Sequence, residues 1–532
     1  MKIIFHGAAQ TVTGSCFQVT SEHSNVLVDC GMFQGSSGER DLNHRPFPFN
    51  PSALDAVILT HAHIDHSGLI PRLCKSGFNG KIYATNATVD LCRIMLPDSG
   101  HIQEMEAEWH NRKRVRQGEA PLSPLYTAED AMASLEYLRP VHYGEEISIN
   151  DGLRVRFRDA GHILGSSIIE MWLTEGEHTV KVVFSGDLGQ ADQPIIRNPA
   201  RVEAADFVIV ESTYGARIHE HKEDKLALLE EVILDMNAKG GKLIIPSFAV
   251  GRAQDILYHI KQLLVEGRIP ALPVYIDSPM AISATEIFRN NPHYFDDETN
   301  QLLRRGESPF EFPNLYFTRS TEESKELNEM EKKAIIISAS GMCEAGRILH
   351  HLRHNLWRPE ANILFVGYQA EGTLGRRILE GAQAVKIFGE EILVKAKINH
   401  IDGFSAHADQ NALLNWLGGF VAKPKTVFLV HGDEDVFPIW SKVVQERLGL
   451  NVVVPQRGDS VDLVQLKMDV QYRTDEPSEA IDLQNLLMQL DAEYLDLRGR
   501  LRQRPDQVPV ERIEDLRQIV RQLHESLLSV EK

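Results

Sequence analysis

The sequence predicts an α/β protein in which packed sheets with outer helices form one domain and a doubly wound parallel sheet forms another. Two observations lead to this prediction. Short apolar runs of strand length fill the first two hundred residues, with helical stretches between several of them. From about residue 206 strands and helices alternate regularly, which is typical of a parallel sheet covered by helices. A β-rich, histidine-bearing pattern returns after about residue 375, so we expect the alternating part to be an insertion.

The predicted elements follow from apolar runs and from helical periodicity. In the first domain the predicted strands are residues 2–5, 16–19, 26–29, 56–59, 81–83, 155–157 and 180–184. In the alternating part from about residue 206 the predicted strands are 207–210, 242–245, 274–276 and 334–337, with helices at 222–239 and 251–266. The insertion strands are apolar at nearly every position, as expected for strands buried on both faces.

Length and composition are those of an ordinary globular protein. The chain has 532 residues, 43% apolar and 25% charged, which is enough for more than one domain. No apolar run is long enough to cross a bilayer, and the first residues lack the apolar core of a signal peptide. Five cysteines form no CxxC pair, so reduced thiols are expected, with Cys343 packed rather than reactive. We therefore expect a cytoplasmic protein without a membrane partner.

The charge balance limits the possible partners. With 56 basic and 75 acidic side chains the net charge is −19, which argues against nonspecific coating of nucleic acid. A local cationic surface is still compatible with it. Arg112, Lys113, Arg114 and Arg116 form one such cluster, for which a solvated helix face is an equally good explanation.

The stretch HAHIDH, residues 61–66, follows the apolar run 56–59 directly. Imidazole and carboxylate ligands suit zinc, manganese or iron better than calcium. His61 and His63 are two residues apart and would project the same way from an extended chain, whereas Asp65 and His66 would turn toward another point. This one loop could therefore begin two metal sites.

Further ligands are expected where other strands end. His162 follows the strand 155–157, Asp187 follows 180–184, and His431 follows an apolar run near residue 430, each beside glycine. A single histidine after a strand is more often structural than a ligand. The order of these residues after HAHIDH strengthens the metal hypothesis.

These motifs together resemble the metallo-β-lactamase fold, whose members carry HxHxDH followed by histidine, aspartate and histidine. The resemblance extends over residues 1 to about 455. Glu211, His407 and His431, each within its motif, look like the acidic and two histidine motifs of the β-CASP nucleases. Further stretches at 11–15, 246–248, 338–342 and 367–369 resemble the branch that contains the polyadenylation endonuclease subunit and its bacterial relatives.

The resemblance implies a metallo-β-lactamase αββα sandwich with an inserted β-CASP domain. The expected parts are residues 1–210 and 376–460 for the sandwich, 211–375 for the insertion, and 461–532 for a C-terminal helical extension. In that extension, apolar residues from Leu483 to Leu497 and from Ile513 to Leu527 lie at helical spacing. A hairpin packed on the body and a homodimer contact both remain open for these two helices.

The resemblance also implies a site with two zinc ions, or manganese in their place. One metal would be held by His61, His63 and His162, the second by Asp65, His66 and His431, and Asp187 would bridge them. Asp29 would support the ligand loop by contacting a metal-bound imidazole. A hydroxide bridging two such ions could then attack a phosphodiester in line, because two cations stabilise both the attacking and the leaving oxygen.

Three side chains are expected to take part in catalysis: Glu211, His407 and Asp65. His407 would contact the scissile phosphate or protonate the leaving oxygen, and Glu211 would orient His407. The proteins of this family that act on DNA commonly have valine where RNA-processing members keep a histidine equivalent to His431, so single-stranded RNA is the expected substrate. Weaker candidates for phosphate contacts are Ser340, Gly341, Arg347 and Arg376.

Two other functions compete with that of a ribonuclease. A catalytically silent RNA-binding scaffold would be expected to have lost ligands, yet all seven positions are present. A metallohydrolase for a small ester or thioester would leave the insertion and the region of His407 without a role. His350 and His354 share a helix face but lack a third ligand in the sequence, so they are expected to be surface histidines.

Overall fold

The computed structural model describes residues 1–218, 225–367, 369–370, 372–465 and 467–469. The two helices expected at the C-terminus and Tyr368 lie outside these residues. The described chain contains three sheets of six or more strands and one two-stranded sheet. No described helix is long and apolar enough to cross a membrane.

The first large sheet has eight strands. Its strands β1, β2 and β3 are antiparallel, whereas β3 to β6 run parallel to one another. The parallel strands therefore have their carboxyl ends at one edge of the sheet. In spatial order the strands are β23 (Lys467–Asp469), β22 (Ser460–Asp462), β1 (Lys2–Phe5), β2 (Phe17–Thr20), β3 (Asn25–Val28), β4 (Ala56–Ile58), β5 (Lys81–Thr85) and β6 (Leu138–Val141).

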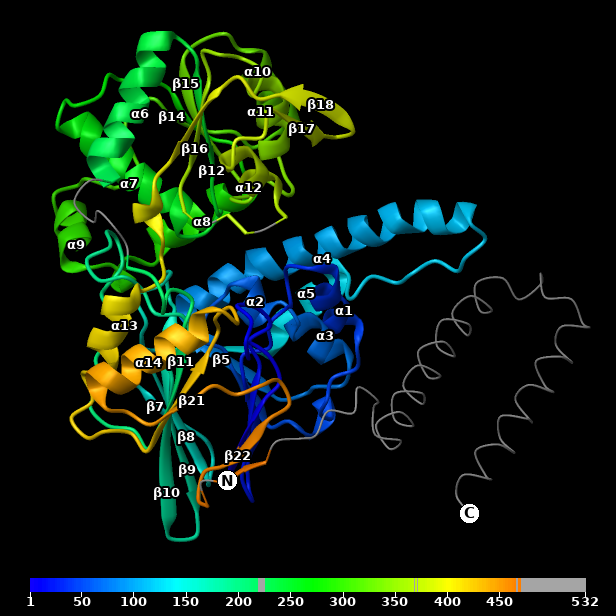
Figure 1. Ribbon diagram of the computed structural model, residues 1–532, viewed down its shortest axis with the longest axis vertical. Coiled ribbons are helices and arrows are strands. Elements are labelled where there is room, and N and C mark those ends of the chain that lie inside the picture. The colour runs from blue at the N-terminus through cyan, green and yellow to red at the C-terminus, as the bar shows by residue number, and fades with distance from the viewer. Residues whose placement is uncertain (219–224, 368, 371, 466, 470–532) are drawn as a thin grey trace, which may run out of the picture. The chain divides into compact units, whose positions relative to one another are not determined.

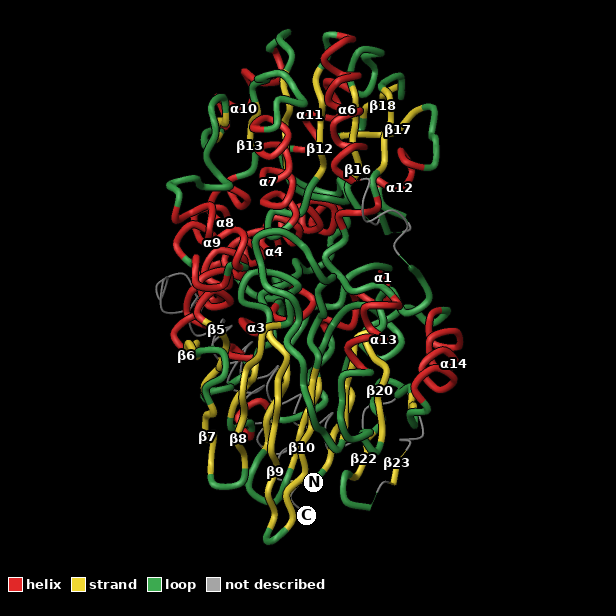
Figure 2. Tube along the Cα trace, turned by 90° about the vertical axis from the view of Figure 1, so that its left-hand side faces the viewer, coloured by secondary structure: helices red, strands yellow, loops and turns green. Residues whose placement is uncertain are grey.

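The second sheet has seven strands, of which β7 to β10 lie side by side as an antiparallel meander (Figure 2). Strands β10, β11, β20 and β21 are parallel. The spatial order is β21 (Val452–Val453), β20 (Thr426–Val430), β11 (Phe207–Glu211), β10 (His178–Phe184), β9 (Ser167–Glu175), β8 (Leu153–Asp159) and β7 (Glu146–Asn150).

The two sheets pack face to face and are covered by helices on the outside. Alternate residues of both sheets form one apolar cluster, in which the ring centroids of Phe5 and Phe428 lie 5.4 Å apart. Residues that point the other way, such as Val57, are also buried, and α4 packs against β5 and β6 on that side. On the second sheet, Val427 packs with Leu413 of α13 and Trp440 of α14. This arrangement confirms the predicted αββα sandwich. The helices are α1 (Ser37–Asp41), α2 (Ile64–Ser67), α3 (Ile70–Lys75), α4 (Asn86–Arg116), α5 (Ala128–Ser134), α13 (Gln410–Leu417) and α14 (Val436–Leu448).

The inserted domain is built on the third sheet, whose six strands are all parallel. Every residue of β12 and β15 is buried, because helices connect the strands and cover the sheet. The strands in order are β14 (Leu315–Phe317), β13 (Val274–Ile276), β15 (Ala334–Ser338), β12 (Lys242–Pro246), β16 (Asn362–Phe365) and β19 (Lys397–His400). The helices are α6 (Lys225–Lys239), α7 (Arg252–Val265), α8 (Pro279–Asn290), α9 (Asp297–Arg304), α10 (Thr321–Glu329), α11 (Ile348–Asn355) and α12 (Leu374–Leu379), and β17 (Ala384–Ile387) pairs with β18 (Glu390–Leu393).

The insertion interrupts the second sheet between two strands that are neighbours in space. Strand β11 leads into the inserted domain, and β20 returns from it to pair with β11 in parallel (Figure 1). The predicted insertion is therefore confirmed as a topology.

The sheets reach further along the chain than the expected domain boundaries. Strand β19 pairs with β16, so the inserted sheet extends to His400 rather than ending at residue 375. Strands β22 and β23 complete the first sheet beyond residue 460. Both stretches are short, and β19 has the sequence Lys-Ile-Asn-His, so neither contains the apolar run by which the other strands were predicted.

The interface between the sandwich sheets should dominate the stability of this domain. Phe428→Ala removes a ring that contacts Phe5 and Phe207, and it should lower the free energy of unfolding by about 3–5 kcal/mol. Ile439→Ala, at a 52% exposed position of α14, is the control and should change it by less than about 0.5 kcal/mol. Urea unfolding followed by circular dichroism measures both. Equal midpoints for the two variants would contradict the shared core described above.

Candidate metal centre

The predicted ligands lie where strands of both sandwich sheets end. HAHIDH begins three residues after Ile58, the last residue of β4, and its Asp65 and His66 form part of the short helix α2. His162 follows β8, Asp187 follows β10, and His431 follows β20. Gly161 and Gly186 adopt positive φ angles of 65° and 54°, which let the chain turn sharply beside the ligands that follow them.

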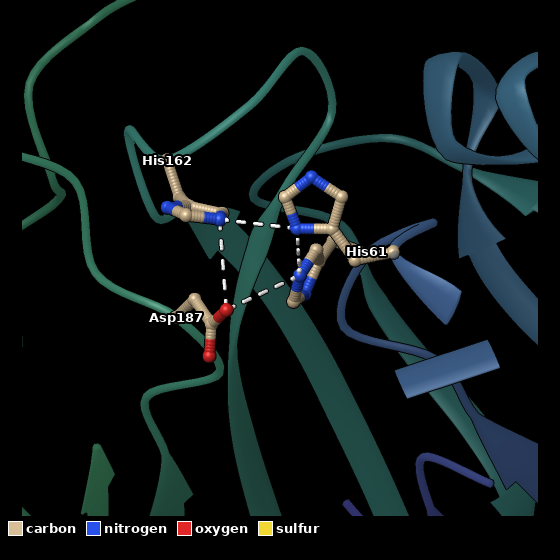
Figure 3. A group of neighbouring side chains, drawn as sticks. His61, His162 and Asp187 are labelled. Carbon is tan, nitrogen blue, oxygen red and sulfur yellow. Dashed lines mark hydrogen bonds and ion pairs between the residues drawn. The ribbon is translucent and has the colours of Figure 1, made fainter. Parts of the chain in front are cut away.

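Three histidines and one carboxylate converge at the first position. His61 Nε2 and His162 Nε2 lie 3.4 and 3.5 Å from Asp187 Oδ2 (Figure 3). His63 Nδ1 lies 3.1 Å from His61 Nε2 and 3.3 Å from His162 Nε2. All four ligand atoms lie within 4.8 Å of one another, which is the clustering that a single cation requires.

The second position is formed by Asp65, His66 and His431. His431 Nε2 lies 3.3 Å from His66 Nε2 and 3.4 Å from Asp65 Oδ2. The other oxygen of Asp187, Oδ1, lies 3.2 Å from His66 Nε2. The two oxygens of Asp187 therefore face the two clusters separately, as a bridging ligand would.

Burial of Asp187 and the neutral state of His61 and His63 fit a cation at the first position. Asp187 Oδ1 is buried and accepts no hydrogen bond from any described residue, an unfavourable state for a carboxylate unless a cation is bound. Burial lowers the pKa of His61 to about 4 and that of His63 to about 3, so both imidazoles are neutral and can ligate at neutral pH. Burial alone would raise the pKa of Asp187, but the facing His431 and His66 hold it well below its usual range.

Asp29 contacts one of the predicted ligands, His66, and the backbone just before HAHIDH. Its Oδ1 accepts from Thr60 N at 2.7 Å, and its Oδ2 accepts from Thr60 Oγ1 at 2.8 Å. His66 Nδ1 lies 2.7 Å from Asp29 Oδ2. A carboxylate can only accept, so the ring proton sits on Nδ1 and Nε2 is left to face the centre.

Three hydroxyl groups at the centre were not predicted. Thr60 Oγ1 lies 3.1 Å from His61 Nδ1, Thr213 Oγ1 lies 3.1 Å from His431 Nδ1, and Ser15 Oγ lies 3.3 Å from His66 Nε2. In the sequence only their positions indicate a role. Thr60 directly precedes HAHIDH, and Ser15 and Thr213 lie inside motifs that carry the family resemblance.

His407 lies beside both clusters and contacts Glu211. Its Nδ1 is 3.2 Å from each carboxylate oxygen of Glu211, and its Nε2 is 3.9 Å from Asp187 Oδ2. Glu211 is 1% exposed and accepts from Leu188 N at 2.7 Å, which fixes its position. Burial alone would lower the pKa of His407, but the carboxylates of Glu211 and Asp187 outweigh it and raise that pKa to about 9. At neutral pH His407 therefore carries a proton near the centre.

None of the four residues expected to contact phosphate belongs to these clusters. Arg347 donates to Asp277 Oδ1 at 2.7 Å and to the backbone oxygens of Thr318 and Arg319, so its guanidinium is engaged within the inserted domain. Arg376 forms an ion pair with the carboxylate of Glu380, four residues later in the chain.

Ser340 and Gly341 directly follow β15, and the Ser340 hydroxyl accepts from Glu344 N at 3.1 Å within the same loop. His350 and His354 join no cluster of metal-ligand type among the described residues. Their neighbour His351, which the sequence did not single out, is buried with Nε2 2.6 Å from Asp277 Oδ2.

Two adjoining clusters of imidazole and carboxylate at the edge of an αββα sandwich define a metallohydrolase type of centre. Residues 10–219 match the metallo-β-lactamase superfamily, residues 253–378 the Beta-Casp domain, and residues 391–455 the Zn-dependent metallo-hydrolase RNA specificity domain.

Three relatives show how far the similarity extends. Ribonuclease TTHA0252 of Thermus thermophilus is 38% identical over 462 residues, which cover 87% of this chain and 100% of that protein. Transcription termination factor FttA of Methanocaldococcus jannaschii is 30% identical over 475 residues, covering 87% and 71%. An RNase J-like protein of the same organism is 31% identical over 458 residues, covering 85% and 98%. The chain belongs to the metallo-β-lactamase superfamily, in the branch that carries a β-CASP domain, and the resemblance inferred from its motifs is confirmed.

Metal content should separate ligands from neighbouring groups. Asp187→Ala removes the carboxylate that faces both clusters, so the variant should lose most of its bound metal. His407→Ala leaves both clusters intact and should retain it. Plasma mass spectrometry after dialysis against zinc measures the metal per chain. Equal loss in the two variants would show that their roles are assigned wrongly.

Proposed function

We propose that this protein is a metal-dependent ribonuclease that hydrolyses phosphodiester bonds of single-stranded RNA. The observation that carries the proposal is the placement of Asp187 between two ligand clusters, with the protonated His407 beside it. The names of two relatives, a ribonuclease and an RNase J-like protein, support RNA as the substrate class. Free cysteines at all five positions agree with a cytoplasmic enzyme.

The proposed cofactors are two zinc ions, with manganese as the alternative. Three imidazoles with one carboxylate form the donor set that zinc prefers, and the second cluster offers two imidazoles with carboxylates. The proposed ligands are His61, His63 and His162 for one ion, Asp65, His66 and His431 for the other, and Asp187 for both. When bound, such ions supply Lewis acidity for the oxygens of a phosphodiester and lower the pKa of water.

The side chains around the ligands would orient groups and move a proton. His407 would donate its Nε2 proton to the leaving oxygen, since Nδ1 is held by Glu211 and Nε2 faces the centre. Glu211 would keep the imidazole charged and aligned. Asp65 would take part through its place in the second cluster, where it contacts His431.

The other candidate functions have weaker support. A silent RNA-binding scaffold would not require seven histidine and aspartate side chains to converge, so their convergence supports the enzyme. A small ester or thioester would leave the inserted domain and the region of His407 without a role. We propose that the loop of Ser340 and Gly341, at the carboxyl end of β15, contacts the RNA backbone, because ligands of parallel α/β sheets bind at that edge.

Purified protein should cleave labelled single-stranded RNA, and chelation of metal should abolish the cleavage. Matching DNA and a generic thioester serve as the comparison substrates, and a circular RNA of the same sequence separates internal cleavage from cleavage at an end. Hydrolysis of the thioester alone would overturn the ribonuclease. RNA binding that survives chelation without any product would favour the scaffold.

The pH profile should reveal the role of Glu211. Glu211→Gln removes the negative charge that raises the pKa of His407 from its ordinary value, so the imidazolium should be lost at lower pH. The alkaline decline of kcat/KM for RNA should therefore shift down by about 1 pH unit or more. Metal content of the variant is checked in parallel. An unchanged alkaline decline with full metal content would exclude His407 as the proton donor.

A further inference from the structure

The long helix α4 divides into a buried half and an exposed half. Its buried residues all lie between Ala87 and Gly100, and none lies beyond that glycine. Figure 1 shows the C-terminal half of α4 extending past the strands of the first sheet. This half contains the cationic cluster that stood out in the sequence and that the proposed reaction does not use.

The exposed half nevertheless has contacts along one side. The chain that follows α4 folds back along one side, where Asn111 and Leu122 exchange two hydrogen bonds of 2.8 and 2.7 Å. Arg114 donates to Ala120 O at 2.8 Å and pairs with Glu119 at 2.9 Å. These contacts cover one side of the helix and leave the opposite side open.

The open side carries a stripe of four residues, Met105, Trp109, Arg112 and Arg116, which we call the α4 stripe. They are spaced by four, three and four residues, so at 3.6 residues per turn they share one face. This spacing is the one by which two helices pack along a common seam. Met105 is 52% exposed and Trp109 is 67% exposed. Exposure of two large apolar side chains side by side is typical of an interaction surface.

The acidic and basic residues of this half are separated along the helix, and this separation favours an antiparallel second copy as the partner. Glu104, Glu106 and Glu108 precede Trp109, whereas the basic residues of the cluster follow it. A second copy lying antiparallel would place its acidic part against the basic part of the first, and a parallel copy would place like charges together. Such self-complementarity is what a twofold interface requires.

One pair of charged residues can test the antiparallel arrangement, because its members form no ion pair within their own chain. Glu106 and Lys113 lie on the same flank of the stripe, seven residues apart, too far for contact within one helix. Neither forms an ion pair with any described residue of its own chain, and both are exposed. In an antiparallel pair centred between Trp109 and His110, Glu106 would lie opposite Lys113 of the partner subunit.

We propose that the α4 stripe is a docking surface for a second copy of this chain, which binds as an antiparallel helix pair with the two Trp109 rings in contact. The proposal does not depend on the proposed ribonuclease activity. One helix pair buries less area than an obligate dimer interface, so the dimer should dissociate in roughly the micromolar range. Because charged residues flank the seam, added salt should weaken it.

Sedimentation velocity of the full chain over a concentration series measures the association. Trp109→Ala should raise the dissociation constant about tenfold or more. Trp357→Ala, at another exposed tryptophan with 50% exposure, is the matched control and should leave it unchanged. A protein that is monomeric at high concentration, or whose dimer tolerates Trp109→Ala, would overturn the proposal.

A charge exchange tests the orientation. Glu106→Lys and Lys113→Glu should each weaken the dimer, and the double variant E106K/K113E should restore it, because the exchanged charges again face each other. Failure of the double variant to restore association would exclude the antiparallel register.

Hydrolysis of bis(p-nitrophenyl) phosphate, a small phosphodiester that could reach only the metal centre, and circular dichroism check folding in every variant. Variants of the α4 stripe that associate normally but lose affinity for long single-stranded RNA would identify the stripe as an RNA contact. That result would refute its role as the dimer interface.

Discussion

The geometry of the centre depends on one buried carboxylate. Asp187 is 2% exposed, and its two oxygens face imidazoles that come from four separate segments of the chain. A carboxylate in this position without opposing charge would be strongly unfavourable, so it requires compensation from the surrounding imidazoles or from a metal ion. The other contacts of the site, including the hydrogen bonds of Asp29 and the pairing of Glu211 with His407, fix the groups that surround this one anion.

The directions of the strands explain why the proposed ligand side chains converge. Strands β4, β10 and β20 all end at the edge where the ligands lie, and β8 ends there because the antiparallel meander returns its carboxyl end to the same side. The insertion leaves this geometry intact, since β20 pairs directly with β11. His431, the last proposed ligand in the sequence, therefore reaches the same group of strand ends as His61, the first.

The sequence predicted those parts of the structure that leave a local pattern. HAHIDH after an apolar run, and single histidine or aspartate residues beside glycine at the ends of other strands, were sufficient to predict the seven side chains that converge, because strand ends are the positions that the topology brings together. Strand β19 left no such pattern, since its pairing with β16 is decided by tertiary contacts. Nor does the sequence show that the guanidinium of Arg347, a predicted phosphate contact, is bound by Asp277, which lies 70 residues earlier in the chain, directly after β13.

The same helix that carries the exposed stripe also touches the metal-binding loop. Thr85 at the start of α4 and Thr88 in its first turn both donate to Gly165 O, at 2.7 and 2.9 Å, in the loop that presents His162. Gly165 has a φ of 81°, and a side chain there would collide with Thr85. The helix is thus fixed to the centre at one end and exposed at the other. A contact between two copies through α4 would therefore make the distance between their metal centres depend on the geometry of this helix, including any bend at Pro97 in its interior.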